Sequence, residues 1–125
     1  MIQGFEDYTH QLTDYEEGVL LPLLVAGLKT KRGKINAITG KKIVETLKPL
    51  GYKITGPRVR KLVNFIRLNG LVINLISSSK GYFIATEAHE IEDYINSLKQ
   101  REEAIAAIRK TYKNLKEWNS PTTTL

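Results

Sequence analysis

The sequence predicts one mainly helical domain with a small β-hairpin and a long C-terminal helix. Several stretches carry apolar residues at spacings of three and four, which is the helical period, and two strand-like stretches flank a polar turn of Ser, Lys and Gly. The 125 residues, of which 42% are hydrophobic, suffice for a core without disulfide or metal support. We expect an arm at 1–12, a core at 13–86, the long helix at 87–118 and a flexible tail at 119–125.

The first helix is predicted to begin at Thr13. This residue can cap the helix, and Glu16 stands three residues later, as in a capping box. The apolar residues between Val19 and Leu28 predict a largely buried helix. Pro22 lies inside this stretch, so we expect either a kink or a later start.

Two shorter helices follow, and a threonine precedes each of them. Thr39 is expected to cap a helix at 40–47 and Thr55 another that ends at Asn69-Gly70. Between the first two helices, residues 36–38 could form a very short strand. Residues 71–76 and 82–85 are predicted strands joined by the polar turn 77–81, and Thr86 is expected to cap the long helix.

Charge is distributed unevenly along the chain. Residues 1–28 hold five acidic residues and no lysine or arginine. Residues 29–80 hold thirteen basic residues and one acid, Glu45, whereas residues 81–125 hold six basic and seven acidic residues. A folded segment with this excess of positive charge attracts polyanions, of which the phosphate backbone is the commonest. The central block therefore indicates a nucleic-acid-binding surface, although a solvated basic face is the alternative.

The order of the predicted elements resembles the winged-helix branch of the helix-turn-helix DNA-binding proteins, in particular small bacterial or phage-encoded ones. The resemblance covers roughly residues 13–95 and is carried by Ile43-Val44 and Leu47, the turn 51–55, the stripe 59–66 and the hairpin 71–85. It implies that the third helix enters the major groove of double-stranded DNA. It also implies a non-catalytic role in transcription regulation, or in replication or packaging of a mobile element.

The third helix supplies the candidate base contacts. Its apolar residues are expected to face inward, which would turn Arg58, Lys61 and Asn64 outward and leave Arg60 on a flank. Arginine can bind guanine and asparagine can bind adenine in bidentate fashion. The alternative is that these are ordinary solvent-facing residues. The candidate phosphate contacts are Thr39, Lys41, Lys42, Lys53, Arg67, Ser79 and Lys80.

The long helix carries a second apolar pattern, with an a/d repeat over four heptads from Ile91 to Leu115 and one polar break at Arg101. Its first half is expected to pack on the first helix. For the second half we expect a homodimer, and Trp118 could either anchor that contact or cover its own helix. The predicted dimer interface consists of Ile105, Ile108, Tyr112 and Leu115.

Enzyme chemistry finds little support. The chain has no cysteine and two histidines, neither with an acid at a familiar metal spacing, so we expect no metal, no cofactor and no catalytic site. No stretch reaches the length of a membrane span and no signal peptide is evident, which predicts a cytoplasmic protein. Two alternatives to DNA stay open: a winged-helix protein–protein interaction module that acts through the long helix, and RNA binding.

Overall fold

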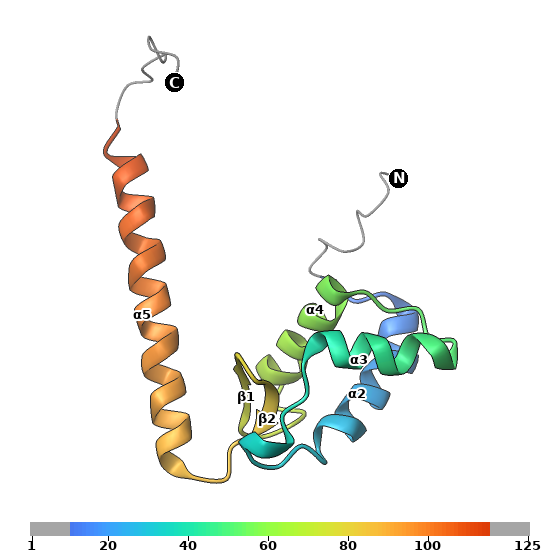
Figure 1. The fold of residues 1–125 in the computed structure, drawn as a ribbon. Coiled ribbons are helices and arrows are strands. Elements are labelled where there is room, and N and C mark those ends of the chain that lie inside the picture. Colours follow the sequence, from blue (N-terminus) through green and yellow to red (C-terminus); the bar gives the residue numbers. More distant parts are fainter. Residues whose placement is uncertain (1–10, 116–125) are drawn as a thin grey trace, which may run out of the picture. The chain divides into compact units, whose positions relative to one another are not determined.

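The computed structural model describes residues 11–115 and confirms the predicted fold class (Figure 1). The chain consists of two units, Met1–Ile91 and Glu92–Leu125. The first contains a mainly helical core with one hairpin, and most of the long helix α5 (Ala88–Lys113) belongs to the second. The predicted arm at 1–12 (apart from residues 11 and 12), Trp118 and the predicted tail lie outside the described residues.

The first helix begins as predicted and changes from π- to α-helical at Leu21, one residue before Pro22. Thr13 and Glu16 form the capping box, with Thr13 N–H donating to Glu16 Oε1 at 2.8 Å and Glu16 N–H donating to Thr13 Oγ1 at 3.1 Å. A π-helical segment, η1 (Glu16–Leu20), leads into α2 (Leu21–Leu28). Pro22 lies in the first turn of α2, where its missing N–H is tolerated. The helix is less buried than predicted, because Val19 is 40% exposed and only one stripe faces the core.

The next two helices have the predicted threonine caps. Thr39 Oγ1 accepts from Lys42 N–H at 3.0 Å at the start of α3 (Gly40–Leu47). Thr55 Oγ1 accepts from Arg58 N–H at 3.4 Å at the start of α4 (Gly56–Leu68). Two 3₁₀ segments flank α3, η2 (Lys34–Asn36) and η3 (Lys48–Leu50), and η3 is followed by Gly51 at φ 94°.

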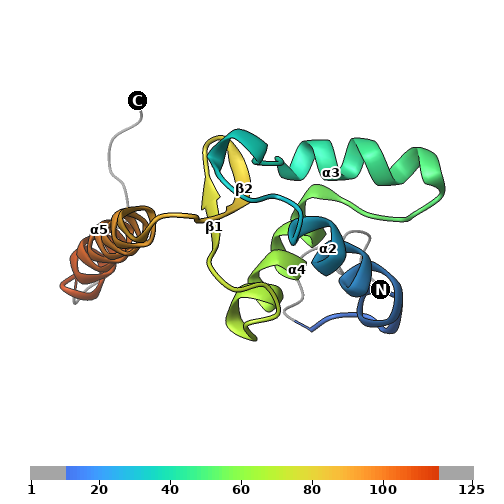
Figure 2. The same cartoon turned by 90° about the horizontal axis from the view of Figure 1, so that it is seen from below.

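The hairpin is shorter than predicted. It pairs β1 (Leu75–Ser78) with β2 (Gly81–Ile84), so Ser77 and Ser78 belong to a strand and the turn is reduced to Ser79 and Lys80. Residues 71–74 form a turn instead of a strand, because Leu71 N–H closes the end of α4 on Ile66 O and Asn74 adopts φ 64°. Seen from below, the hairpin lies at one side of the three core helices (Figure 2).

The predicted strand at 36–38 is reduced to a single bridge. Ile38 pairs with Tyr82 through two backbone hydrogen bonds of 2.7 and 3.0 Å, whereas residues up to Asn36 are 3₁₀-helical. Gly33 N–H also donates to Ile84 O at 2.9 Å, and Ile84 N–H donates to Lys31 O at 2.7 Å. Residues 31–33 and Ile38 thus follow β2 closely without forming a regular strand.

The core is built from the stripes that the helical period predicts. On α4, Val59, Leu62, Val63 and Ile66 are no more than 1% exposed. They meet Leu20, Leu24 and Leu28 of the first helix, Ile43 and Leu47 of α3 and the inner side chains of the hairpin. One side of α4, the helix predicted to enter the major groove, is therefore packed against the rest of the core.

The long helix begins at Ala88, two residues after Thr86. The prediction that Thr86 caps this helix is therefore wrong. The backbone N–H groups of Thr86 and Glu87 both donate to Glu90 Oε1 at 3.1 Å, which ties the start of the helix to its first turn. The helix ends at Lys113, five residues before the predicted end. The predicted packing of Ile91, Tyr94, Ile95 and Leu98 on the first helix stays a prediction. Among residues 11–115, no helix combines the length and the apolar character needed to cross a membrane.

Candidate nucleic-acid interface

Nearly all of the central positive charge lies at the surface. Of the thirteen lysine and arginine residues in 29–80, Arg58 alone is buried. The one acid of this block, Glu45, is exposed and lies 4.0 Å from Lys41 on the same helix. An exposed ion pair at this distance contributes little to stability, so the Lys41 charge stays available to a binding partner. The surface of the core is therefore strongly basic.

The start of α3 and the turn of the hairpin are held against each other by Gly81. At φ 116°, a Cβ on this residue would lie 2.4 Å from the carbonyl carbon and oxygen of Ile38 and 2.7 Å from Thr39 N. Only glycine permits this approach. Gly40, the residue after Thr39, also lies close to other elements: a Cβ on it would be 3.6 Å from Val59 Cγ1 and 4.0 Å from the Tyr82 ring. The first turn of α3 is thereby fixed to both the hairpin and α4.

Two lysines from different elements line one open hollow. Lys34 comes from η2 and Lys80 from the hairpin turn, and Ile35 and Ala37 complete the lining. The turn that carries Lys80 is held by Ser78 Oγ, which accepts from Lys80 N–H at 3.1 Å and donates to Gly81 O at 3.0 Å. Ser79 and Lys80 are both exposed. We call Lys34, Lys41, Lys42 and Lys80 the basic rim.

The first turn of α3 contributes two lysines to the basic rim. Lys41, Lys42 and Thr39 are all exposed there. Two cations at a helix N-terminus oppose the helix dipole, so this arrangement is stabilised when an anion binds to the same turn. A phosphate is the anion that suits backbone N–H groups and lysine side chains together.

The outward face of α4 differs from the prediction. Arg60, Asn64 and Arg67 follow one another at spacings of four and three, and Arg67 Nη2 donates to Asn64 Oδ1. Arg60 and Asn64 are exposed, whereas Lys61 and Arg67 are half-buried. Arg60 is therefore accessible from solvent, and its predicted role in base contact stays a prediction. Lys61 is more covered than predicted because its position borders the buried stripe.

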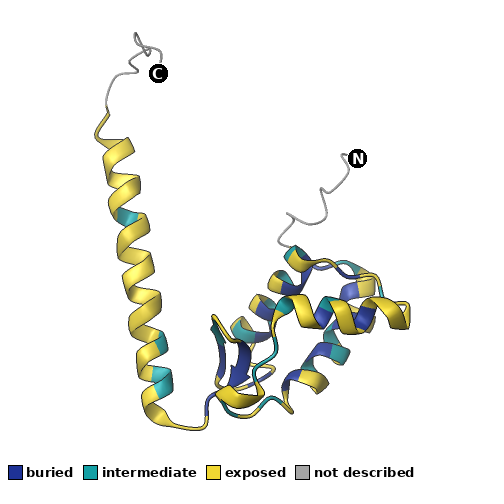
Figure 3. Ribbon diagram, in the orientation of Figure 1, coloured by how far each residue is buried: buried dark blue, intermediate teal, exposed yellow. Residues whose placement is uncertain are grey.

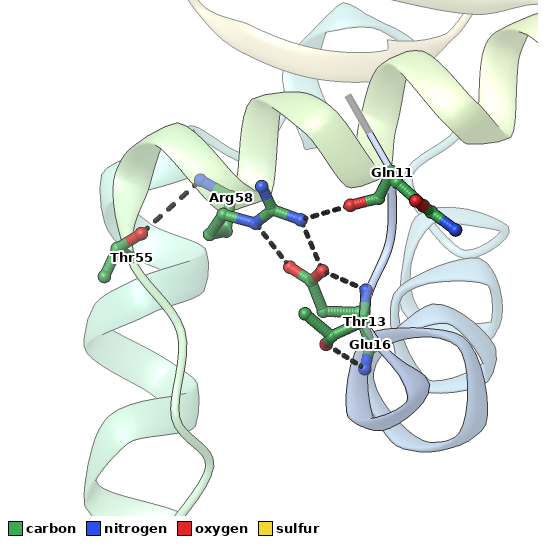
Figure 4. A network of polar contacts seen from close by, with 5 residues as sticks. All are labelled: Gln11, Thr13, Glu16, Thr55 and Arg58. Atoms are coloured by element: carbon green, nitrogen blue, oxygen red, sulfur yellow. Dashed lines mark hydrogen bonds and ion pairs between the residues drawn. The ribbon is translucent and has the colours of Figure 1, made fainter. Parts of the chain in front are cut away.

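Arg58 is buried and not available to a nucleic acid, which corrects its predicted role in base contact. It is 6% exposed and forms an ion pair with Glu16, which is 4% exposed (Figure 4). Arg58 Nε donates to Glu16 Oε2 at 2.7 Å and Nη2 donates to Glu16 Oε1 at 2.5 Å. Nη2 also donates to Gln11 O at 3.2 Å. The guanidinium thus fixes residues 11–16 to the start of α4.

The charge of Glu16 is stabilised inside this network. Burial by itself would raise the pKa of the carboxyl group. The hydrogen bonds from Arg58 and from Thr13, together with the positive charge of Arg58, outweigh burial, and the pKa lies below its ordinary value of 4.5. The pair is therefore ionised at neutral pH, and Arg58 contributes no net charge to the surface.

Lys53 lies apart from the basic rim in sequence and in surroundings. It is exposed in the loop before α4, where its N–H donates to the Tyr15 hydroxyl at 3.1 Å. It lines an open hollow next to the ion pair, together with Thr55, Glu16 and Arg58. The predicted phosphate contact by Lys53 stays a prediction.

Sequence reasoning missed two features of this surface. Lys34 was not among the candidate contacts, and its place in the hollow with Lys80 depends on the backbone contacts between residues 31–38 and β2. The partner of Arg58 was also missed. Its signal is a spacing of four: Glu16 precedes the buried Leu20, Leu24 and Leu28 just as Arg58 precedes Leu62 and Ile66.

Comparison with known proteins supplies no relative. No protein family matches the chain, and neither the curated proteins nor the solved structures contain a match. Between residues 11 and 115, no group of three or more His, Cys, Asp or Glu side chains is arranged to hold a metal ion.

Proposed function

We propose that the protein binds double-stranded DNA without catalysis, as a winged-helix protein whose wing is the β1–β2 hairpin. The basic rim would contact phosphates, and the outward face of α4 would lie in the major groove. The order of helices and hairpin supports this proposal, because it is the order of the winged-helix fold. The predicted cytoplasmic location and a role in transcription regulation, or in replication or packaging of a mobile element, follow from this proposal.

The observation that carries the proposal is the meeting of Lys34 and Lys80 in one hollow, while Gly81, the residue after Lys80, approaches Thr39 at the start of α3. Like charges that lie together at a surface cost free energy unless a polyanion or salt compensates them. Lys34, Lys80 and the α3 turn come from three separate elements that Gly81 and the Ile38–Tyr82 bridge hold together. Such a convergence suits a phosphate backbone better than a merely solvated basic face.

Base contacts are assigned to Arg60 and Asn64, with Lys61 at the border of the same face. Arg60 replaces Arg58 in this role because it is exposed and Arg58 is paired with Glu16. An arginine that binds guanine contributes about 1–3 kcal/mol of discrimination between base pairs. Arg67, which donates to Asn64, can orient the amide for adenine.

The test is the affinity for a random duplex at several salt concentrations, measured by fluorescence anisotropy. The wild-type affinity should fall steeply with salt, and the double variant Lys34→Ala/Lys80→Ala should lower the slope by about 2, because each lysine that binds a phosphate contributes close to one. Lys48→Ala is the matched control, since Lys48 is exposed in η3 beyond the other end of α3. Equal slopes for all three proteins, or no binding at low salt, would contradict the proposal.

A second measurement separates base contacts from phosphate contacts. Selection of bound sequences from a random pool should yield a preferred site for the wild type. Arg60→Ala should relax one position of that site, whereas Lys80→Ala should keep the site and weaken all sequences alike. The interaction-module alternative predicts instead that neither variant changes DNA affinity while self-association persists.

A further inference from the structure

The long helix α5 exposes an apolar stripe over its second half. Ile105, Ile108, Tyr112 and Leu115 are each at least 60% exposed, and Figure 3 shows that exposed residues predominate along the helix. These positions continue the a/d repeat that begins at Ile91. A stripe of this kind is the surface of a two-stranded coiled coil. Which partner covers it can be decided from the charges on the same helix.

The two ends of α5 carry opposite charge. Residues 88–96 hold Glu90, Glu92 and Asp93 and no lysine or arginine, and residues 106–115 hold Arg109, Lys110 and Lys113 and no acid. The middle of the helix, from 97 to 105, has two basic and two acidic residues. A second copy that runs antiparallel would place each acidic end next to a basic end. A parallel copy would place like charges together at both ends, which is unfavourable.

The polar break in the repeat favours the same orientation. Arg101 occupies a d position between Leu98 and Ile105. In a parallel pair in register, Arg101 faces its own copy across the seam, so two guanidinium groups meet in an apolar environment. In an antiparallel pair centred between residues 101 and 105, Arg101 faces Ile105 instead and can extend its charged end past the seam into water.

We propose that α5 pairs with the α5 helix of a second copy of the chain in antiparallel orientation. Tyr94 then lies opposite Tyr112 of the second copy and Leu98 opposite Ile108 of the second copy, which replaces the predicted packing of Tyr94 and Leu98 on the first helix. Each of these layers occurs twice, because the pair is symmetric about its centre. The antiparallel order gives every apolar residue of the seam an apolar or aromatic partner except at Ile105, which faces Arg101. This proposal does not depend on DNA binding.

The first experiment is the mass of the full-length protein in solution by sedimentation velocity over a range of concentrations. The chain of 14.2 kDa should sediment as a dimer. Ile108→Asp should give a monomer, because it places a charge in the seam. Ala107→Asp should remain a dimer, because it adds the same charge one residue away on the exposed face. A wild-type protein that stays monomeric would overturn the proposal, including the case in which α5 covers the apolar hollow between α2 and α3 of its own core.

The second experiment tests the orientation. The natural chain has no cysteine, so introduced cysteines are the only thiols. Ser97→Cys and Thr111→Cys change exposed residues that lie on opposite sides of the proposed centre, at equal distances in sequence from residue 104. When the two variants are mixed and exchange subunits, a short bismaleimide should link the thiol of one variant to the thiol of the other and should not link either variant to itself. Links within each single variant and none between them would indicate a parallel pair and overturn the antiparallel assignment.

Both measurements are made without DNA, so their outcome is separate from that of the proposed function. A protein that dimerises but does not bind a duplex would retain the antiparallel pair and lose the DNA proposal. A monomer whose affinity depends on Lys34 and Lys80 would do the reverse.

Discussion

The helices α4 and α5 carry apolar residues at the same helical spacing but differ in what covers them. On α4, Val59, Leu62 and Ile66 are 0% exposed. On α5, Ile105 is 66% and Tyr112 is 71% exposed. The period of the sequence determines which face of a helix is apolar, and in both helices it does so correctly. It does not determine whether the cover comes from the same chain or from another molecule.

The charged residue within each stripe shows the same difference. Arg58 stands one turn ahead of Leu62 on the buried face of α4, and Glu16 from the first helix neutralises it there. Arg101 interrupts the stripe of α5, and we propose that it faces an isoleucine of a second copy. A charge in a stripe thus stabilises the fold in one region and selects the orientation of a partner in the other.

The largest expected effect is that of a cavity in the core. Leu62→Ala removes a fully buried side chain and should lower the free energy of unfolding by about 3–5 kcal/mol. Ile108→Ala, the matched change on α5, should leave the unfolding of the core unchanged and weaken self-association. Urea unfolding followed by circular dichroism and sedimentation measure the two quantities. A similar loss of core stability in both variants would contradict the difference between the helices.

Removing one partner of the buried ion pair is expected to have a slightly smaller effect. Arg58→Met leaves the Glu16 carboxylate buried without its guanidinium and should cost about 3 kcal/mol in urea unfolding. This loss is at the low end of the range for a broken buried ion pair, because the open hollow beside Glu16 and Arg58 lets water reach the remaining carboxylate. The double variant Glu16→Leu/Arg58→Leu should recover most of the loss, since no charge then remains in the core. A double variant as unstable as Arg58→Met would assign the loss to packing instead.

The corresponding change on α5 should have the opposite sign. Arg101→Leu fills the one polar position of the seam and should tighten the dimer about tenfold, or ~1.4 kcal/mol. Sedimentation over a dilution series measures the change in dissociation constant. Lys99→Leu, on the outer face of the same helix, is the control and should not tighten it. Weaker association of Arg101→Leu would indicate that the arginine makes a favourable contact across the interface.

Acid should produce the smallest effect. Because folding lowers the pKa of Glu16 below 4.5, the ion pair stabilises the protein above that pH. This contribution is lost as the pH falls through the lower pKa of the folded state. The wild type should therefore lose more stability between pH 7 and about pH 3 than the double variant Glu16→Leu/Arg58→Leu, as measured by urea unfolding at both values. Equal losses would show that other carboxyl groups account for the acid response.

Much of the fold could be predicted from local signals. The Thr39 and Thr55 caps and the helix bounds 40–47 are found where the sequence placed them, because a cap depends on residues within one turn. The hairpin was less well predicted. Residues 71–74, with the β-branched Val72 and Ile73, are strand-like by composition, but the end of α4 uses them as its closing turn, and Asn74 takes a left-handed conformation there.

The candidate site was predicted in part, because its charges belong to several elements. The exposed positions of Lys41, Lys42 and Lys80 follow from helix and turn patterns. The burial of Arg58 depends on Glu16, which is 42 residues away in the sequence, and no local pattern contains that contact. The hollow between Lys34 and Lys80 likewise depends on a loop that follows β2 by isolated hydrogen bonds.

The π-helical segment η1 sets the helical register of Glu16. The buried residues Glu16, Leu20, Leu24 and Leu28 are spaced by four throughout, and in an α-helix each such step turns the stripe by about 40°. The wider turn of η1, closed by Leu21 N–H on Glu16 O, takes back part of that rotation at the first step. Deletion of the exposed Gly18 would leave Glu16 four residues before Leu21, so Leu21 N–H could still close on Glu16 O as in a regular α-helix. The π turn therefore holds one additional residue on the exposed side of the helix while Glu16 keeps its place beside Arg58.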